Sequence, residues 1–192
     1  MFERGVDAFD RAVDRSIARW RGNPLADAAS SVASALGDHG LVWFVLGLIR
    51  GRHPGPGRAR AVRAVAFTGL VVPGVNAALK SAVGRVRPER RSRASLPVRV
   101  PRTASFPSGH SLAAWCAATL LAEDDPWAPG YYLLAGAIST SRVHVRLHHA
   151  TDVVAGSLLG LVLGRMGRRI VPLSGDLMRR VSRMECTPRK GG

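Results

Sequence analysis

Apolar residues at the start of the chain recur at steps of three and four. The residues with this spacing are Phe2, Val6, Phe9, Val13, Ile17 and Trp20, and charged residues fill the other faces. This period is that of an amphipathic α-helix. We therefore predict a helix within residues 1–22. It either packs on the rest of the protein or lies in a membrane interface, with Trp20 and the arginines at headgroup level.

Apolar segments follow, and most of them have the length and composition of helices. They run over residues 29–49, 62–79, 109–122, 130–143 and 151–166. None contains the roughly 18 uninterrupted apolar residues that predict a transmembrane helix on their own. Small residues are frequent, and Trp and Tyr lie near the segment ends, as in bundles of membrane helices. The pattern predicts an all-α membrane bundle of about five short transmembrane helices, preceded by an N-terminal amphipathic interfacial helix.

The connectors between these segments differ in charge. Residues 50–63 are basic, residues 123–130 begin with three acidic residues, and residues 81–108 form the longest loop, which is rich in arginine. If the segments alternate in direction, the 81–108 loop and the 144–150 turn meet at one end of the bundle. The other two connectors then meet at the opposite end. Both ends are basic, so charge gives only a weak orientation in the membrane.

The chain carries a formal net charge of +15, with 28 Lys and Arg against 13 Asp and Glu. This charge favours an anionic partner: nucleic acid, an acidic lipid surface or a phosphorylated substrate. The basic segments lack the interleaved aromatic residues of a single-strand binder, so no nucleic-acid partner is expected. The charged N-terminus has no apolar core of a secretory signal. Cys116 and Cys186 are not expected to form a disulfide.

Two cations lie at the end of the second apolar segment. Lys80 and Arg87 are seven residues apart, about two helical turns, so both side chains can project from one face. Pro88 disfavours helix at the residue before it and marks the exit into the loop. An ammonium and a guanidinium placed in this way suit an oxyanion with several oxygens.

A second group of polar residues directly precedes the 109–122 segment, in the sequence Pro107-Ser108-Gly109-His110. Ser108 is placed to cap the helix, and Gly109 lets a ligand approach the backbone. The free N–H groups of a helix start bind phosphate readily. His110 lies within reach as a proton donor.

A third group runs from Ser141-Arg142 to His148 and Asp152. A spacing of four places Asp152 one helical turn after His148 on the same face. The carboxylate can then accept the imidazole N–H and leave the other ring nitrogen free to attack. Arg142 adds a third cation.

In order and spacing, the segments KSAVGRVRP, PSGH and SRVHVRLHHATD resemble the three-part signature of the type-2 phosphatidic acid phosphatase family. That family includes lipid phosphate phosphatases, bacterial class A acid phosphatases and, at the level of the active site, vanadium haloperoxidases. The match covers residues 80–152. The apolar segments on either side fit the membrane branch of the family.

The resemblance implies a role for each matched residue. His148 is the nucleophile that becomes phosphohistidine, Asp152 orients it, and His110 is the general acid. The phosphoryl oxygens are held by Lys80, Arg87, Arg142, the Ser108 hydroxyl and the amides of Gly109 and His110. These cations supply the positive charge, so neither a metal nor another cofactor is expected.

Together these features predict a phosphatase that hydrolyses a phosphomonoester or pyrophosphate of a phospholipid or polyprenyl phosphate. We expect an integral protein of a bacterial cell membrane that contacts membrane lipids. Residues 1–170 are expected to form one membrane-embedded domain, with 81–108 as the active-site loop. Residues 171–192 are expected to form a basic, partly disordered tail.

Three other interpretations compete with this one. His144, His148 and Asp152 could seat zinc on one helical face, provided that the helix runs unbroken from residue 144. The chain could instead be a soluble-type, nonspecific acid phosphatase that acts on small phosphomonoesters. Finally, it could be a basic membrane-binding protein without enzymatic activity.

Overall fold

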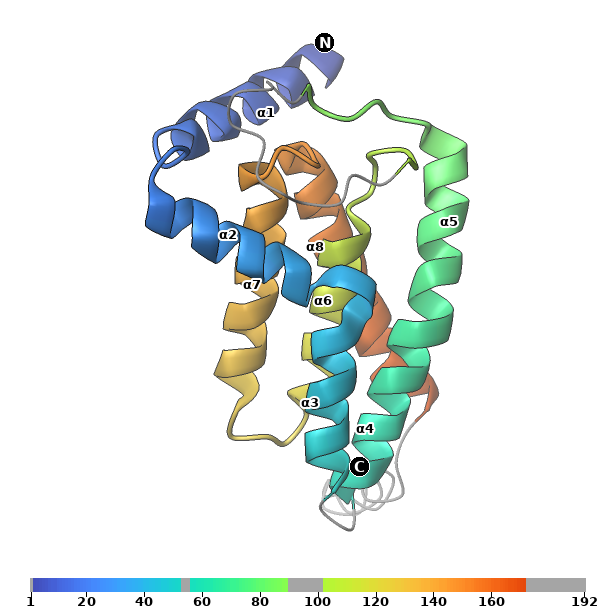
Figure 1. The fold of residues 1–192 in the computed structure, drawn as a ribbon. Coiled ribbons are helices and arrows are strands. Elements are labelled where there is room, and N and C mark those ends of the chain that lie inside the picture. The colour runs from blue at the N-terminus through green and yellow to red at the C-terminus, as the bar shows by residue number, and fades with distance from the viewer. Residues whose placement is uncertain (1, 53–55, 90–101, 172–192) are drawn as a thin grey trace, which may run out of the picture.

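The computed structural model describes residues 2–52, 56–89 and 102–171, and the secondary structure in these ranges is entirely helical (Figure 1). The predicted tail from residue 172 onward and residues 90–101 of the predicted active-site loop lie outside the described residues. The elements are α1 (Phe2–Ala18), α2 (Pro24–Leu36), the 3₁₀ turn η1 (Asp38–Gly40), α3 (Leu41–Gly51), α4 (Pro56–Ala66), the π-helical turn η2 (Phe67–Val71), α5 (Val72–Val83), α6 (Gly109–Leu121), α7 (Ala128–His144) and α8 (Ala150–Ile170).

The N-terminal segment forms helix α1, as predicted, and lies across the end of the bundle at which α7 turns into α8 (Figure 1). Its residue Asp10 is buried, with 7% of its surface exposed. Phe9 and Trp20 remain exposed, at 46% and 63%. The helix therefore packs on the bundle and keeps apolar surface free at the same time.

The first long apolar segment, residues 29–49, forms two helices rather than one. Asn23 caps α2 by accepting from the backbone N–H groups of Leu25 and Ala26. The chain then bends by 65° between α2 and α3 at the turn η1. Gly40 ends this turn with a φ of +68°, a conformation that glycine adopts without strain. The bend carries Asp38 toward the start of α6.

Helices α4 and α5 form one continuous helix that contains the π-helical turn η2. Pro73 lacks a backbone N–H, and its ring crowds the carbonyl four residues earlier. At η2 the N–H of Val72 donates to the carbonyl of Phe67, five residues back. The wider turn accommodates the proline and keeps the helix continuous, although the sequence pattern is interrupted there.

Helix α6 lies at the centre of the bundle, and α8 packs directly against it. Most of its apolar side chains are buried, and those of Leu112 and Leu120 are completely inaccessible. Glycines on α8 permit the close approach: a Cβ at Gly156 would lie 2.5 Å from the carbonyl oxygen of Ser108. This is the small-residue packing that membrane helices use.

Two helices in the described residues, Gly57–Val83 and Ala150–Ile170, are long and apolar enough to cross a membrane, and the bent pair α2–α3 is a third if its two helices are counted as one span. The 17 residues of α7 cover about 26 Å of the roughly 30 Å hydrocarbon thickness. The 13 residues of α6 cover only about 20 Å, and neighbouring helices enclose them. Each of the predicted apolar segments nevertheless corresponds to helices of the bundle.

Ion pairs join the two connectors at the end of the bundle away from α1. Arg60 Nη2 lies 2.7 Å from Asp124 Oδ2, and Arg50 and Arg63 pair with Asp125 and Glu123. These contacts bring residues 50–63 and 123–130 together, as the predicted alternation of segments requires. They also leave the described loop residues 84–89 and 102–108 to share the opposite end with the 144–150 turn.

Candidate active site

The turn between α7 and α8 positions His148. Helix α7 ends at His144, and the carbonyl of Arg142 then accepts from the backbone N–H groups of Leu147 and His148 at 3.0 and 3.2 Å. Helix α8 begins at Ala150. His148 thus precedes the helix that carries Asp152, so the prediction that both lie on one helical face was wrong. The capping turn still brings them together, because the Asp152 carboxylate folds back onto the helix start.

The imidazole of His148 is almost fully buried, at 3% exposure. Its Nδ1 lies 3.7 Å from Asp152 Oδ2 and 3.5 Å from Ser105 Oγ. Its Nε2 lies 3.3 Å from Arg87 Nη1. Burial lowers the pKa of His148 to about 4, although the hydrogen bond with Asp152 opposes this shift. The ring is therefore neutral near pH 7, with Nε2 directed toward a cation.

The Asp152 carboxylate is held by donors from three parts of the chain. Arg85 Nη1 donates to Oδ1 at 2.7 Å. The backbone N–H of His149 donates to Oδ2 at 2.9 Å, and the Ser105 hydroxyl also donates to Oδ2. The side chain of Asp152 is completely buried, so these donors compensate the loss of water. Sequence reasoning did not identify Arg85 or Ser105 as site residues.

Lys80 and Arg87 converge on the same part of the active-site loop. The Lys80 ammonium and Arg87 Nη2 both donate to the carbonyl of Ala104. Arg87 also binds the carbonyl oxygens of Thr103, at 3.0 Å, and Leu147, at 2.6 Å. Burial lowers the pKa of Arg87, and the charge of Asp152 opposes this shift. Both predicted cations therefore fix this part of the loop, and Arg87 also lies beside His148.

Arg142 projects from the last turn of α7 and is 1% exposed. Its Nη1 donates to the Ser34 hydroxyl, whereas its Nε and Nη2 have no hydrogen-bond partner among the described residues. Buried N–H groups of a guanidinium are costly to leave unpaired. Their arrangement fits an anion that supplies the missing acceptors.

The start of α6 has the predicted capped form. Ser108 is buried, and its Oγ accepts from the backbone N–H and the hydroxyl of Ser111 at 3.4 and 3.0 Å. The Ser108 N–H donates to the carbonyl of Asp152 at 3.0 Å and ties α6 to the start of α8. Gly109 allows a close contact, because a Cβ there would lie 2.9 Å from Asn76 Nδ2.

His110 has an acidic partner that the sequence did not reveal. Its Nε2 lies 2.8 Å from Asp38 Oδ1, in the turn that joins α2 to α3. The two residues are 72 positions apart in the chain. Asp38 lies within the apolar segment 29–49, where no local spacing links it to His110.

The geometry removes the basis of the zinc interpretation. Helix α7 ends at His144, so no unbroken helix joins it to Asp152. His144 Nε2 instead lies 2.7 Å from Asp27 Oδ1. Within the described parts of the chain, no three His, Cys, Asp or Glu residues are grouped to hold a metal ion.

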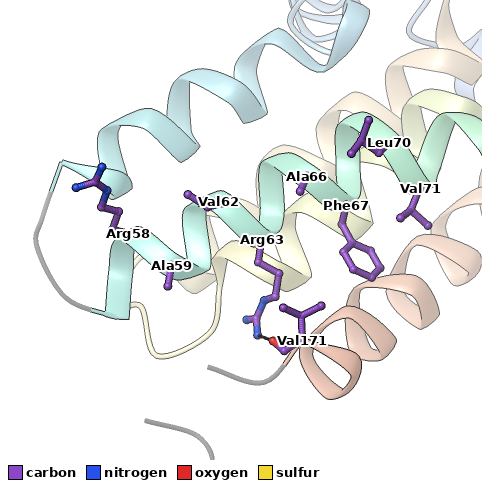
Figure 2. Close-up of a pocket in the computed structure, with 9 residues that line it drawn as sticks. All are labelled: Arg58, Ala59, Val62, Arg63, Ala66, Phe67, Leu70, Val71 and Val171. Carbon is purple, nitrogen blue, oxygen red and sulfur yellow. Dashed lines mark hydrogen bonds between the residues drawn. The ribbon is translucent and has the colours of Figure 1, made fainter. Parts of the chain in front are cut away.

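Two cavities differ in their relation to this site. A cavity of about 350 Å³ between α1 and the α7–α8 turn has His148 in its wall. A larger groove of about 700 Å³ lies along α4 and η2 and is lined mainly by apolar residues such as Val62, Phe67 and Leu70 (Figure 2). None of the predicted site residues contributes to this groove. It therefore belongs to the outer surface of the bundle and not to the candidate active site.

Sequence comparisons match this chain to one protein family and to two kinds of phosphatase. Residues 61–176 match the PAP2 superfamily. The chain is 31% identical over 153 residues to decaprenylphosphoryl-5-phosphoribose phosphatase of Mycolicibacterium smegmatis, a match that covers 80% of this chain and 82% of that protein. It is 36% identical over 101 residues to phosphatidylglycerophosphatase B of Bacillus subtilis, over 46% and 47% of the two chains.

Solved structures share the fold. A transmembrane PAP2-type phosphatidylglycerolphosphate phosphatase of Bacillus subtilis superposes with a TM-score of 0.69 at 23% identity, over 86% of each chain. LpxE of Aquifex aeolicus superposes with a TM-score of 0.70 at 23% identity, over 82% of this chain and 93% of that one. The predicted all-α membrane bundle is thereby confirmed, and so is the prediction of a phosphatase. By sequence and by fold, this chain belongs to the PAP2 superfamily.

Proposed function

We propose that the protein hydrolyses a phosphomonoester or pyrophosphate of a lipid in a bacterial cell membrane, with His148 as the nucleophile. The observation that carries this proposal is the position of His148: buried, neutral near pH 7, and with Nε2 3.3 Å from Arg87 Nη1. The names of two relatives, decaprenylphosphoryl-5-phosphoribose phosphatase and phosphatidylglycerophosphatase B, support a phosphorylated lipid as the substrate.

In the first step, Nε2 of His148 attacks phosphorus. A P–N bond forms and the P–O bond to the lipid breaks, while His110 gives its proton to the departing oxygen. Asp152 holds the Nδ1 side of the ring and stabilises the positive charge that develops on it. Lys80, Arg87 and Arg142 neutralise the charge on the phosphoryl oxygens, because charge spreads over these oxygens in the transition state.

In the second step, water attacks the phosphohistidine and His110 accepts a proton from it. The P–N bond breaks, inorganic phosphate leaves, and His148 returns to its neutral form. Asp38 holds the His110 ring through both steps, since its carboxylate lies 2.8 Å from Nε2. The other ring nitrogen of His110 then exchanges the proton with the substrate or water.

The acyl or prenyl tail of the substrate lies between helices in this proposal, and its headgroup enters from the end of the bundle that α1 covers. Only the phosphate is held by the cations described above. Selectivity for the lipid tail and the headgroup therefore depends on surfaces other than the residues that hold the phosphate.

The proposal is tested by phosphate release from a panel of lipid phosphates in detergent, with a small water-soluble phosphomonoester for comparison. We expect turnover of at least one lipid phosphate, and a loss of more than about a thousandfold in the His148→Ala variant. Reactions with a lipid phosphate radiolabelled in its phosphoryl group should label the wild-type protein and not this variant. They are quenched with detergent at alkaline pH, because the P–N bond of phosphohistidine hydrolyses in acid. The matched control is His149→Asn, which keeps a side chain able to cap α8. Undiminished phosphate release by His148→Ala would contradict the proposal. Release from the small ester alone would favour the nonspecific acid phosphatase.

A further inference from the structure

Helix α1 is joined to the active site through Asp10. The Asp10 side chain is buried and accepts three hydrogen bonds from outside its own helix. The backbone N–H of Thr151 donates to Oδ1 at 2.8 Å, and the Thr151 hydroxyl donates to Oδ2 at 2.9 Å. Arg85 Nη2 also donates to Oδ2, at 2.7 Å. Asp10 thus contacts the residue next to Asp152 and the cation that binds Asp152.

The guanidinium of Arg85 bridges two carboxylates. One amino group, Nη2, binds Asp10, while the other, Nη1, binds Asp152 Oδ1 at 2.7 Å. Burial lowers the pKa of Arg85, but the hydrogen bond with Asp10 and the charge of Asp152 more than offset it and leave the pKa raised. The planar fork of arginine fixes both contacts at once, and a lysine cannot reproduce this geometry.

This bridge determines where Asp152 points. Asp152 is fully buried and its Oδ2 faces His148 Nδ1, so a rotation of the carboxylate would change the orientation of the ring. Arg85 lies only two residues from Arg87, which is beside His148 Nε2. Without Asp10, the Arg85 guanidinium would be free to turn from Asp152 toward an incoming phosphate. The carboxylate of Asp10 therefore keeps Arg85 bound to Asp152, which in turn holds the ring of His148.

We propose that Asp10 is a positioning residue of the active site: it fixes Arg85, which fixes Asp152 and thereby the ring of His148. This inference rests on the phosphatase mechanism proposed above. It makes α1 a part of the catalytic machinery rather than only a helix at the membrane surface. Two further contacts attach the same region to the α7–α8 turn: Arg146 Nη2 binds Asp14 Oδ2 at 3.0 Å, and Arg21 Nε binds the carbonyl of His144 at 2.9 Å.

The test compares Asp10→Asn with Asp7→Asn in the full chain. Asp7 lies one turn earlier on α1 and is exposed, so its variant removes the same charge from the same helix without touching Arg85. We expect kcat of Asp10→Asn to fall roughly ten- to a hundredfold with KM within about twofold, because misplacement of a reacting group lowers the rate of the chemical step. Asp7→Asn should retain wild-type kcat. Thermal unfolding of both variants in detergent shows whether they remain folded.

A double-mutant cycle with Arg85→Gln distinguishes positioning from general damage. If Asp10 acts through Arg85, adding Asp10→Asn to Arg85→Gln should change kcat by less than about twofold. The inference would be overturned if the losses in kcat caused by the two single substitutions multiplied in the double variant, or if Asp10→Asn had a wild-type kcat. An inactive His148→Ala beside a fully active Asp10→Asn would refute only the role of Asp10. A fully active His148→Ala would refute the proposed mechanism itself.

Discussion

The ionisation of His148 governs the acid side of the pH profile. Burial lowers its pKa to about 4, so the neutral, nucleophilic form persists as the pH falls from 7 to about 5 and is lost near pH 4. We predict that kcat/KM for a water-soluble phosphomonoester, corrected for the substrate's own ionisation at about pH 6, does not fall as the pH is lowered from 7 to about 5. Over this range His148 stays neutral, and the His110 acid gains protons. A pH series from about 3.5 to 8 measures it. An acid limb centred at about 6.5, the ordinary value for histidine, would contradict this assignment.

The pair formed by Asp38 and His110 predicts a dependence on the leaving group. An alkoxide needs a proton to depart, whereas p-nitrophenolate does not. Asp38→Asn should therefore lower kcat/KM for an alkyl phosphate by roughly tenfold, part of the 10²–10⁴ that a general acid contributes. The effect on p-nitrophenyl phosphate should stay within about twofold. Equal losses for both substrates would show that Asp38 supports the structure and not the proton transfer.

At the scale of residues, the sequence predicted the proposed reacting groups better than the residues that hold them in place. His148, Arg87 and Asp152 could be predicted as neighbours because each belongs to a short segment with a characteristic spacing. Ser105 and Asp38 act across 47 and 72 positions of sequence, on Asp152 and His110, so no local spacing marks them. The one local signal was the alternation Arg85-Val86-Arg87, in which both cations turn inward while Val86 is 82% exposed.

At the scale of elements, the contact between α6 and α8 depends on glycine. A Cβ at Gly160 would lie 2.5 Å from the carbonyl oxygen of Leu112 and 2.9 Å from Trp115 Cβ. Gly160→Val should therefore destabilise the protein by about 1–3 kcal/mol or more, the usual cost of overpacking a core. It should also lower activity, since α6 carries His110 and α8 carries Asp152. Thermal unfolding in detergent measures the first effect and phosphate release the second.

The matched control for this contact is Gly136→Ala on α7, where a Cβ would meet nothing within 4 Å. That substitution should leave stability unchanged or raise it by about 0.4–1 kcal/mol, because alanine loses less backbone freedom on folding than glycine. If Gly160→Val were as stable as Gly136→Ala, the close packing of α6 on α8 would be incorrect.

Apolar periodicity predicted the helices more reliably than their breaks. The bend between α2 and α3 falls at Asp38–Gly40, inside a segment whose hydropathy continues on both sides. Pro73 is the opposite case: a proline in an apolar run suggests a break, yet the predicted segment 62–79 lies within one continuous helix. The π-helical turn before it absorbs the ring and keeps Gly57–Val83 continuous. Both outcomes depend on the surrounding packing, which a linear pattern does not contain.

At the scale of the molecule, the weak hydropathy of several segments has a structural cause. Helix α6 is enclosed by α7, α8 and the α3–α5 region, so lipid need not solvate it and its composition need not be that of an isolated span. The end away from α1 is held by charged pairs such as Arg60 with Asp124. The arginines at that end form ion pairs that hold the connectors together. Their number therefore reflects packing, and a count of basic residues gives little information on the orientation of the chain in the membrane.

This arrangement predicts that the two ends of α7 lie on opposite faces of the membrane. Pro126, before α7, and Arg102, on the active-site loop, are both exposed, and the native Cys116 is buried. In a Cys186→Ser background, a membrane-impermeant maleimide applied to intact cells should label only one of Pro126→Cys and Arg102→Cys, and both after permeabilisation. The labelled position also identifies the face from which substrate phosphate enters, since Arg102 adjoins the loop that binds Arg87. Labelling of both in intact cells would mean that α7 does not cross the bilayer.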